Sequence, residues 1–325
     1  MAILLRHVPT SAPRLHRCVM TLLLIDAHCH LHDERLWSSS SPSSRRAFEG
    51  VLSRARNAHV THVVSCATHE QDWRVLEQLL GQLKHDSSLQ MVPVFGVHPW
   101  WAQELSPDSL QPLRDVLTRY PEASVGEIGL CKTARGKQVP ADVQVETFRA
   151  QLELAAELER SCVLHCVGYY GKLLEILQGV GRLPSVLVLH SYSGPPNMMR
   201  SFLALQGTRV FFSLNAKQLT DPRMKKAAAC CKELPLDALL LETDAPDQAP
   251  SVEHVEKVFV REAQEVGGVP LLLQEEHSAD VNEPALVKLA LHSAAEVRGV
   301  AADELAVAVY QNCKEAFGIN GPKPN

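Results

Sequence analysis

Residues 22–30 read Leu-Leu-Leu-Ile-Asp-Ala-His-Cys-His, an apolar run that ends in two histidines. Successive side chains of a β-strand point to opposite faces, so we expect His28 and His30 on one face and Cys29 on the other. Two imidazoles in this arrangement can bind one divalent cation. The same pattern also fits a pair of polar residues at a strand end, so the rest of the chain must decide between the two interpretations.

Seven further apolar runs follow this one, separated by longer segments with helical periodicity. The predicted strands are Leu22–His30, His62–Ala67, Met91–His98, Ser124–Leu130, Cys162–Val167, Val186–Tyr192, Arg209–Leu214 and Leu239–Asp244. Between them we predict helices over Trp73–Leu83 and Val143–Glu159, the second with Phe148 and Leu152 on its apolar face and Gln144 elsewhere. Apolar strands alternating with amphipathic helices indicate a parallel sheet covered by helices. Eight units predict a single-domain α/β fold, a (β/α)8 TIM-like barrel, although a doubly wound sheet has the same local signature.

The composition supports one large globular domain. The chain has 325 residues, 46% of them hydrophobic, and 32 basic against 37 acidic side chains give a net charge of −5. No general basic field attracts nucleic acid or an anionic membrane, so affinity for phosphate must come from a local site or a metal. The nine cysteines form no CxxC pair, which favours free thiols in a reducing compartment, cytoplasmic or nuclear. No stretch approaches the roughly 18 apolar residues of a membrane span, so no membrane association is expected.

Ionisable side chains stand at the ends of several predicted strands. Besides His28 and His30 they are Glu127, His165, His190 and Asp244. Such a group is costly to bury unless it is paired or bound to a metal. The carboxyl ends of barrel strands open on one face, so we expect the six side chains to converge there. Histidines and carboxylates together suit Zn²⁺, Mn²⁺ or Mg²⁺, with open positions for water, as in metal-dependent hydrolases.

An ordered set of motifs resembles those of the TatD-like metal-dependent hydrolases, amidohydrolase-type TIM barrels that are known as deoxyribonucleases. The motifs are Asp-Ala-His-Cys-His-Leu (26–31), Phe-Gly-Val-His-Pro-Trp (95–100), Gly-Glu-Ile-Gly-Leu (126–130), Leu-His-Cys (164–166), His-Ser-Tyr-Ser-Gly (190–194), Glu-Thr-Asp-Ala-Pro (242–246), Asn-Glu-Pro (282–284) and the closing Asn312 to Phe317. The resemblance extends from about Leu24 to Phe317 and looks most like a eukaryotic, fungal-type branch. It implies the same six metal ligands that the strand ends select.

We expect two divalent metal ions in this site. One would be bound by His28, His30 and Asp244, the other by His165 and His190, with Glu127 bridging them, as in two-metal hydrolases. Asp244 is also the expected acceptor of a proton from the attacking water.

Four neighbouring residues have expected roles in support. His98 would contact the phosphate or leaving group of the substrate, or orient the loop before Pro99 by a hydrogen bond. Asp26 would accept a hydrogen bond from a ligand histidine. Trp100 and Trp101 would stack on a base, or only cover the rim of the barrel.

Three positions depart from the pattern of the resembling family. Cys131 replaces a usual aspartate, Asp247 replaces a usual tyrosine, and Ala279-Asp280-Val281 lacks the arginine often found there. These departures make nuclease activity a less secure expectation than hydrolase activity. The resemblance still favours a DNA phosphodiester as the substrate, and a monomer is expected. The alternatives are a metal-dependent ester or amide hydrolase, such as a D-aminoacyl-tRNA deacylase, and a non-catalytic barrel that binds a partner protein. Retention of all six ligands disfavours the last.

The remaining segments are interpreted from composition. Residues 1–21 precede the barrel, expected over 22–319, and contain arginines but no acidic residue. They are predicted to be a flexible extension, either upstream of a start at Met20 or a mitochondrial presequence within residues 1–19. Ser38–Arg46 is a predicted loop, and residues 320–325 form a tail. The segment Asp247–Val281, with a predicted helix over Val252–Val266, is expected to line the substrate cleft.

Overall fold

Eight parallel strands pair in the order of the sequence in the computed structural model, which describes residues 22–38, 41–105, 110–256 and 281–319. The strands are β1 Leu24–Cys29, β2 Val60–Cys66, β3 Gln90–Phe95, β4 Ser124–Cys131, β5 Cys162–Val167, β6 Val186–Leu189, β7 Arg209–Asn215 and β8 Leu239–Glu242. The first and last strands also meet, because Asp244 N donates to His28 O at 2.9 Å and a bridge joins Cys29 to Ala245. The predicted (β/α)8 barrel is confirmed, and the doubly wound alternative is wrong.

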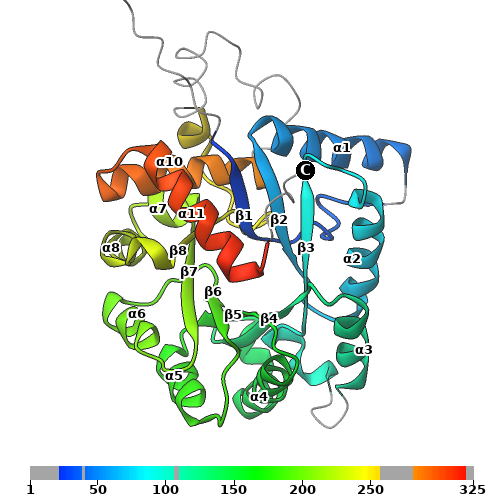
Figure 1. The fold of residues 1–325 in the computed structure, drawn as a ribbon, viewed down its shortest axis with the longest axis vertical. Helices are drawn as coiled ribbons and strands as arrows, with labels where there is room; N and C mark the ends of the chain where they lie inside the picture. Colours follow the sequence, from blue (N-terminus) through cyan, green and yellow to red (C-terminus); the bar gives the residue numbers. More distant parts are fainter. Residues whose placement is uncertain (1–21, 39–40, 106–109, 257–280, 320–325) are drawn as a thin grey trace, which may run out of the picture.

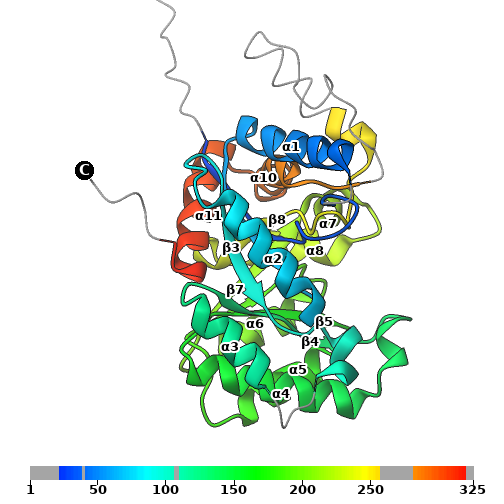
Figure 2. The same cartoon turned by 90° about the vertical axis from the view of Figure 1, so that its right-hand side faces the viewer.

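Helices surround the strands on the outside, as Figures 1 and 2 show. They are α1 Pro42–Asn57, α2 Glu70–Leu83, α3 Gln111–Arg119, α4 Ala141–Glu157, α5 Tyr170–Gly179, α6 Pro196–Leu203, α7 Ala216–Thr220, α8 Lys225–Glu233, α10 Val287–Arg298 and α11 Ala302–Phe317. Short 3-10 turns are η1 Pro99–Glu104, η2 Gly136–Gln138, η3 Leu236–Ala238 and η5 Pro284–Leu286. Within the described ranges no helix is both long and apolar enough to cross a membrane. The predictions for residues 1–21 and 320–325, and most of the insert, lie outside the described residues.

Two local predictions need correction. The predicted loop Ser38–Arg46 is in part helical, because Ser41 Oγ accepts a hydrogen bond from Ser44 N and Pro42 occupies the first turn of α1. Gln144 is buried rather than on an outer face. Its side chain accepts from Cys131 N at 2.8 Å and donates to Gly136 O at 2.8 Å, so it satisfies backbone groups beyond β4 that would otherwise lack partners.

The barrel has an outer core and a separate inner core. The inner core consists of strand side chains such as Ile25, Val94 and Phe211, together with Cys313, Ala316 and Phe317 of α11. Asn312 Nδ2 donates to the carbonyls of Leu236 and Leu239, at the start of β8. Helix α11 therefore closes the amino end of the barrel, and the opposite end is left for the predicted site.

Candidate metal centre

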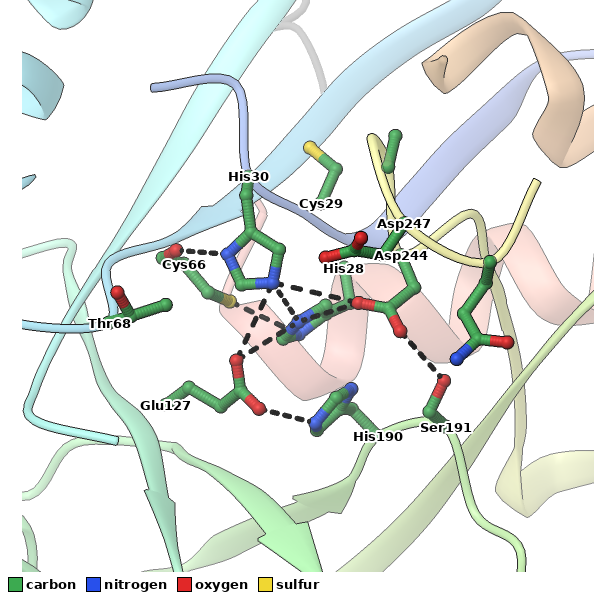
Figure 3. A network of polar contacts seen from close by, with 12 residues as sticks. His28, Cys29, His30, Cys66, Thr68, Glu127, His190, Ser191, Asp244 and Asp247 are labelled. Carbon is green, nitrogen blue, oxygen red and sulfur yellow. Dashed lines mark hydrogen bonds and ion pairs between the residues drawn. The ribbon is translucent and has the colours of Figure 1, made fainter. Parts of the chain in front are cut away.

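The six predicted ligands converge at the carboxyl end of the barrel. They come from the ends of β1, β6 and β8 and from within β4 and β5. Figure 3 shows His28, His30, Glu127, His190 and Asp244 turned toward one another. His28 and His30 place their Nε2 atoms 3.3 Å apart. His165 Nδ1 lies 3.2 Å from His190 Nε2. The structure thus brings together two histidine pairs, as the strand ends indicate.

Glu127 lies between the two pairs with one oxygen toward each. Its Oε2 is 3.5 Å from His28 Nε2 and 3.6 Å from His30 Nε2. Its Oε1 is 2.8 Å from His165 Nδ1 and 2.7 Å from His190 Nε2. A carboxylate with its two oxygens turned to two donor sets is suited to bridging two cations.

The second glycine of Gly-Glu-Ile-Gly allows β4 to approach β5 closely enough for these contacts. A Cβ on Gly129 would lie 2.0 Å from the carbonyl oxygen of His165, and Gly129 has φ of +144°. Any larger residue would push the two strands apart and separate Glu127 from His165. The spacing of the motif is therefore a packing requirement as well as a chemical one.

Asp244 reaches the first histidine pair from the other side. Its Oδ1 is 3.7 Å from His28 Nε2 and 3.6 Å from His30 Nε2, and its Oδ2 accepts from Ser191 Oγ at 3.3 Å. The backbone of Asp244 is left-handed, with φ of +60°, a conformation that Asp tolerates better than most residues. This turn out of β8 directs the carboxylate toward the centre, and such local strain is typical of functional sites.

The orientation of each histidine ring determines which of its nitrogens faces the centre. His30 Nδ1 donates to Cys66 O at 2.7 Å, so its Nε2 is turned to the centre. His165 Nε2 and His190 Nδ1 are buried without a hydrogen-bond partner among the described residues. The opposite nitrogens of the same rings, His165 Nδ1 and His190 Nε2, face Glu127. Both side chains belong to groups of His and carboxylate residues in metal-binding geometry. The His, Glu and Asp clusters of this centre fit divalent metal ions.

The electrostatics keep the central carboxylate ionised. Burial alone would raise the pKa of Glu127, but the neighbouring His190 and His98, together with the hydrogen bond from His165, hold that pKa well below its usual range. Burial likewise opposes a charge on His30, yet Asp244 and Glu127 raise its pKa to about 9. An ionised carboxylate is the form that binds a divalent cation.

Asp26 accepts a hydrogen bond from the ligand histidine His28, as predicted, but from its backbone N rather than its ring. Its carboxylate accepts from Thr243 N at 2.8 Å, from Thr243 Oγ1 at 2.5 Å and from the backbone N of His28 at 3.3 Å. The register of β1 is irregular between Asp26 and Cys29, which interrupts the simple alternation of faces. Asp26 instead ties β1 to β8 beside Asp244.

Both predicted arrangements of His98 are compatible with its position. Its Nδ1 accepts from Trp100 N at 3.1 Å and so caps η1. In the neutral ring the proton is then on Nε2, which lies 3.5 Å from Glu127 Oε1. His98 therefore both orients the loop and faces the centre.

Glu242 is a member of the centre that the strand-end argument misses. It is fully buried, and its Oε1 accepts from Ser191 N at 2.8 Å and lies 3.9 Å from His190 Nδ1. Burial raises its pKa to about 7. A signal for it exists in the sequence, because Glu242 precedes Asp244 by two residues, the same spacing as between His28 and His30.

Comparison with known proteins identifies the family. The model of the family described as TatD related DNase matches residues 25–318. The chain belongs to this family. It is 25% identical over 308 residues to the human protein named deoxyribonuclease TATDN3, covering 90% of this chain and 94% of that one. It is 28% identical over 271 residues to a 3'-5' ssDNA/RNA exonuclease TatD of Erwinia amylovora, covering 83% and 93%. The crystal structure of the TatD homologue YJJV from Escherichia coli superposes with a TM-score of 0.71 at 26% identity, covering 93% of this chain and all of that one.

This TatD family member carries a thiol beside its centre, at the position where the resemblance predicts an aspartate. Burial opposes ionisation of Cys131, but the neighbouring His165 lowers its pKa to about 7. Trp100 Nε1 donates to Cys131 Sγ at 3.2 Å. The substitution thus couples the tryptophan of His-Pro-Trp to the rim of the site.

Proposed function

We propose that this protein is a metal-dependent phosphodiesterase that cleaves DNA. The observation that carries the proposal is the position of Glu127, with one oxygen facing each histidine pair. Membership of the TatD related DNase family supports the phosphodiester as the bond attacked.

Two divalent cations would bind in the centre. His28, His30 and Asp244 would hold one, since their ligand atoms form a compact triad. His165 and His190 would hold the other, and Glu127 would bridge the pair. Zn²⁺, Mn²⁺ and Mg²⁺ are the candidates. When bound, such ions lower the pKa of a water and neutralise charge that develops on the phosphate.

The residues of the chain have separate tasks in this proposal. Asp244 would accept the proton of the attacking water, and Ser191 Oγ donates to its Oδ2. His98 would donate from Nε2 to a phosphate oxygen of the substrate. Glu242 would orient His190 from behind, because it lies on the far side of that ring from Glu127.

Single-stranded DNA is the first substrate to test. The human relative is named a deoxyribonuclease, and the Erwinia relative is named an exonuclease of single-stranded DNA and RNA. A monomer in a reducing compartment, cytoplasmic or nuclear, stays our prediction, and the eight described cysteines, all free and buried, support the compartment.

The decisive experiment compares metals and substrates on the same protein. Metal-stripped protein is reloaded separately with Zn²⁺, Mn²⁺ and Mg²⁺ and assayed on end-labelled single-stranded DNA, duplex DNA, RNA and an aminoacyl ester. We expect DNA cleavage that requires metal. Loss of a general base typically lowers the rate about 100-fold or more, so the rate of DNA cleavage by the Asp244→Asn variant should fall by that factor. Asp237→Asn is the matched control, an exposed aspartate at the opposite end of β8.

Two results would reject the proposal. Hydrolysis of the aminoacyl ester without cleavage of nucleic acid would favour the ester hydrolase. Equal DNA cleavage by the Asp244→Asn and Asp237→Asn variants would show a contaminating nuclease.

A further inference from the structure

Arg135 lies over two tryptophan rings beside the metal centre. Its Cζ is 4.4 Å from the centroid of Trp100 and 4.8 Å from that of Trp101. The residue is exposed, and across the described ranges no carboxylate pairs with its guanidinium. Among the described residues the N–H groups of the guanidinium therefore bond neither a carboxylate nor the backbone, while its flat face packs on the two tryptophan rings.

The two rings under Arg135 are held from behind. Trp101 stacks on His69 with centroids 4.7 Å apart and planes 16° apart, and His69 Nδ1 is 2.9 Å from Asp72 Oδ2. Trp100 is held by its bond to Cys131 Sγ. A guanidinium on two fixed rings loses little further freedom when it binds a ligand.

The stack adjoins the centre directly. The centroid of Trp100 lies 4.5 Å from that of His98 and 6.4 Å from that of His165. One aromatic ring thus separates the guanidinium from two of the side chains that face the cleaved bond. An anion bound by Arg135 would belong to the same substrate molecule.

We propose that Arg135, supported by Trp100 and Trp101, binds the phosphate of the nucleotide next to the cleaved bond in single-stranded nucleic acid. The inference rests on the proposed function. A guanidinium fork matches phosphate oxygens in a bidentate manner, and the net charge of the chain is −5, so phosphate affinity must be local. Arg135 therefore sets the preference for a polynucleotide over a small diester.

The test compares three variants on two substrates. Arg135→Gln removes the fork, Arg135→Lys keeps only the charge, and Lys137→Gln is the control, an exposed cation of the same turn without a described ring contact. The substrates are an oligodeoxythymidylate of about ten nucleotides and bis(p-nitrophenyl) phosphate. A charge-assisted hydrogen bond is worth about tenfold or more in binding. Arg135→Gln should therefore raise KM for the oligonucleotide about tenfold, with kcat and the small diester unchanged. The salt dependence of binding should weaken by about one unit of slope, and Arg135→Lys should recover only part of the affinity.

Binding measured by fluorescence anisotropy with the same labelled oligonucleotide separates this proposal from the proposed function. If wild-type protein binds the oligonucleotide without cutting it, and Arg135→Gln weakens that binding, the proposed Arg135 contact is supported and the proposed phosphodiesterase function is rejected. If Arg135→Gln behaves as Lys137→Gln does, or if wild-type protein does not bind the oligonucleotide, the Arg135 contact is wrong.

Discussion

Glu127 joins the two halves of the metal centre through a single carboxylate. Glu127→Gln should therefore reduce the content of both metals, because an amide lacks the charge and one of the acceptor oxygens. His165→Ala should chiefly weaken the binding of one of the two metals. The measurement is metal stoichiometry by elemental analysis, alongside turnover, for both variants. Glu122→Gln, an exposed glutamate just before β4, serves as the control and should keep both metals.

Two tightly bound metals and near-normal turnover in the Glu127→Gln variant would show that the bridging assignment is wrong. Loss of one metal in that variant and of both in His165→Ala would reverse the roles of the two residues.

For single residues, the sequence predicts well which side chains belong to the site when the residue stands at the end of an apolar run. His190 and Asp244 are predicted in this way, since an ionisable group at the end of a buried strand is costly unless it binds a partner or a metal. Glu242 escapes the same argument because it lies inside the predicted strand, two residues before Asp244. Asp26 bonds the predicted ligand histidine His28, but its bonds to Thr243 are not predicted, because the pairing of β1 with β8 leaves no local trace in the sequence.

The start of α2 depends on one carboxylate oxygen. Asp72 Oδ2 accepts from Thr68 N at 2.8 Å and from Thr68 Oγ1 at 2.7 Å, and lies 3.1 Å from His32 Nε2. Burial opposes its ionisation, yet the bonds from His32 and Thr68 hold the pKa of Asp72 well below the usual 3.8. A carboxyl whose pKa is lower in the folded than in the unfolded state stabilises the fold at pH values above its unfolded-state pKa. This contribution is lost as the pH falls through its folded-state pKa.

Asp72→Asn should therefore lower the free energy of unfolding at neutral pH by about 1.5–3 kcal/mol, the range for a hydrogen bond to a charged group. The difference from wild type should be complete above about pH 5 and shrink as the pH falls below about 4. Urea unfolding at a series of pH values measures it. A difference that stays constant down to about pH 2 would show that the charge of Asp72 is not the cause.

At the scale of elements, periodicity predicts where α2 and α4 lie but not what their polar residues do. Phe148 and Leu152 are buried as the apolar pattern indicates. Gln144 is buried as well, because the backbone after β4 offers donors and acceptors that only the folded chain brings near. Periodicity indicates only the average polarity of a helix face, so it does not predict that one polar residue is buried by a specific hydrogen-bond partner.

Across the whole molecule, α11 and the strands share one inner core. Phe317→Ala should lower the free energy of unfolding by about 3–5 kcal/mol, as is usual for truncation of a buried phenylalanine. Val307→Ala on the same helix is the control, because Val307 is 55% exposed and such changes are usually within about 0.5 kcal/mol. Urea midpoints of the two variants give the comparison. Equal and small losses would show that α11 does not close the barrel floor.

Metal should stabilise the folded barrel as a whole, because its ligands are assembled only in the native state. With free metal at 100 times its dissociation constant the stabilisation is about 2.7 kcal/mol, so chelation should lower the melting temperature measurably. Differential scanning calorimetry of wild-type protein and the Glu127→Gln variant, with and without a chelator, measures this. A wild-type transition that is indifferent to the chelator would contradict a tight site.

Closure of the ring is the part of the fold that no local pattern in the chain contains. The eight apolar runs are visible in the sequence, but they fit an open sheet equally well. What distinguishes the barrel is the pairing of His28 with Asp244, more than two hundred positions apart, and of Cys29 with Ala245. Such contacts depend on the twist and stagger accumulated over all strands.

The position of α11 has a consequence for synthesis of the chain. Ribosomes produce the eight strands before residues 313–317, so a nascent barrel lacks the side chains that shield Ile25 and Phe211 from water at its amino end. The site needs β8 docked on β1, and α11 contacts both strands at the amino end of the barrel. Closure of the site would thus be a late event in the folding of this nuclease, because the helix that supports β1 and β8 follows all eight strands in the chain.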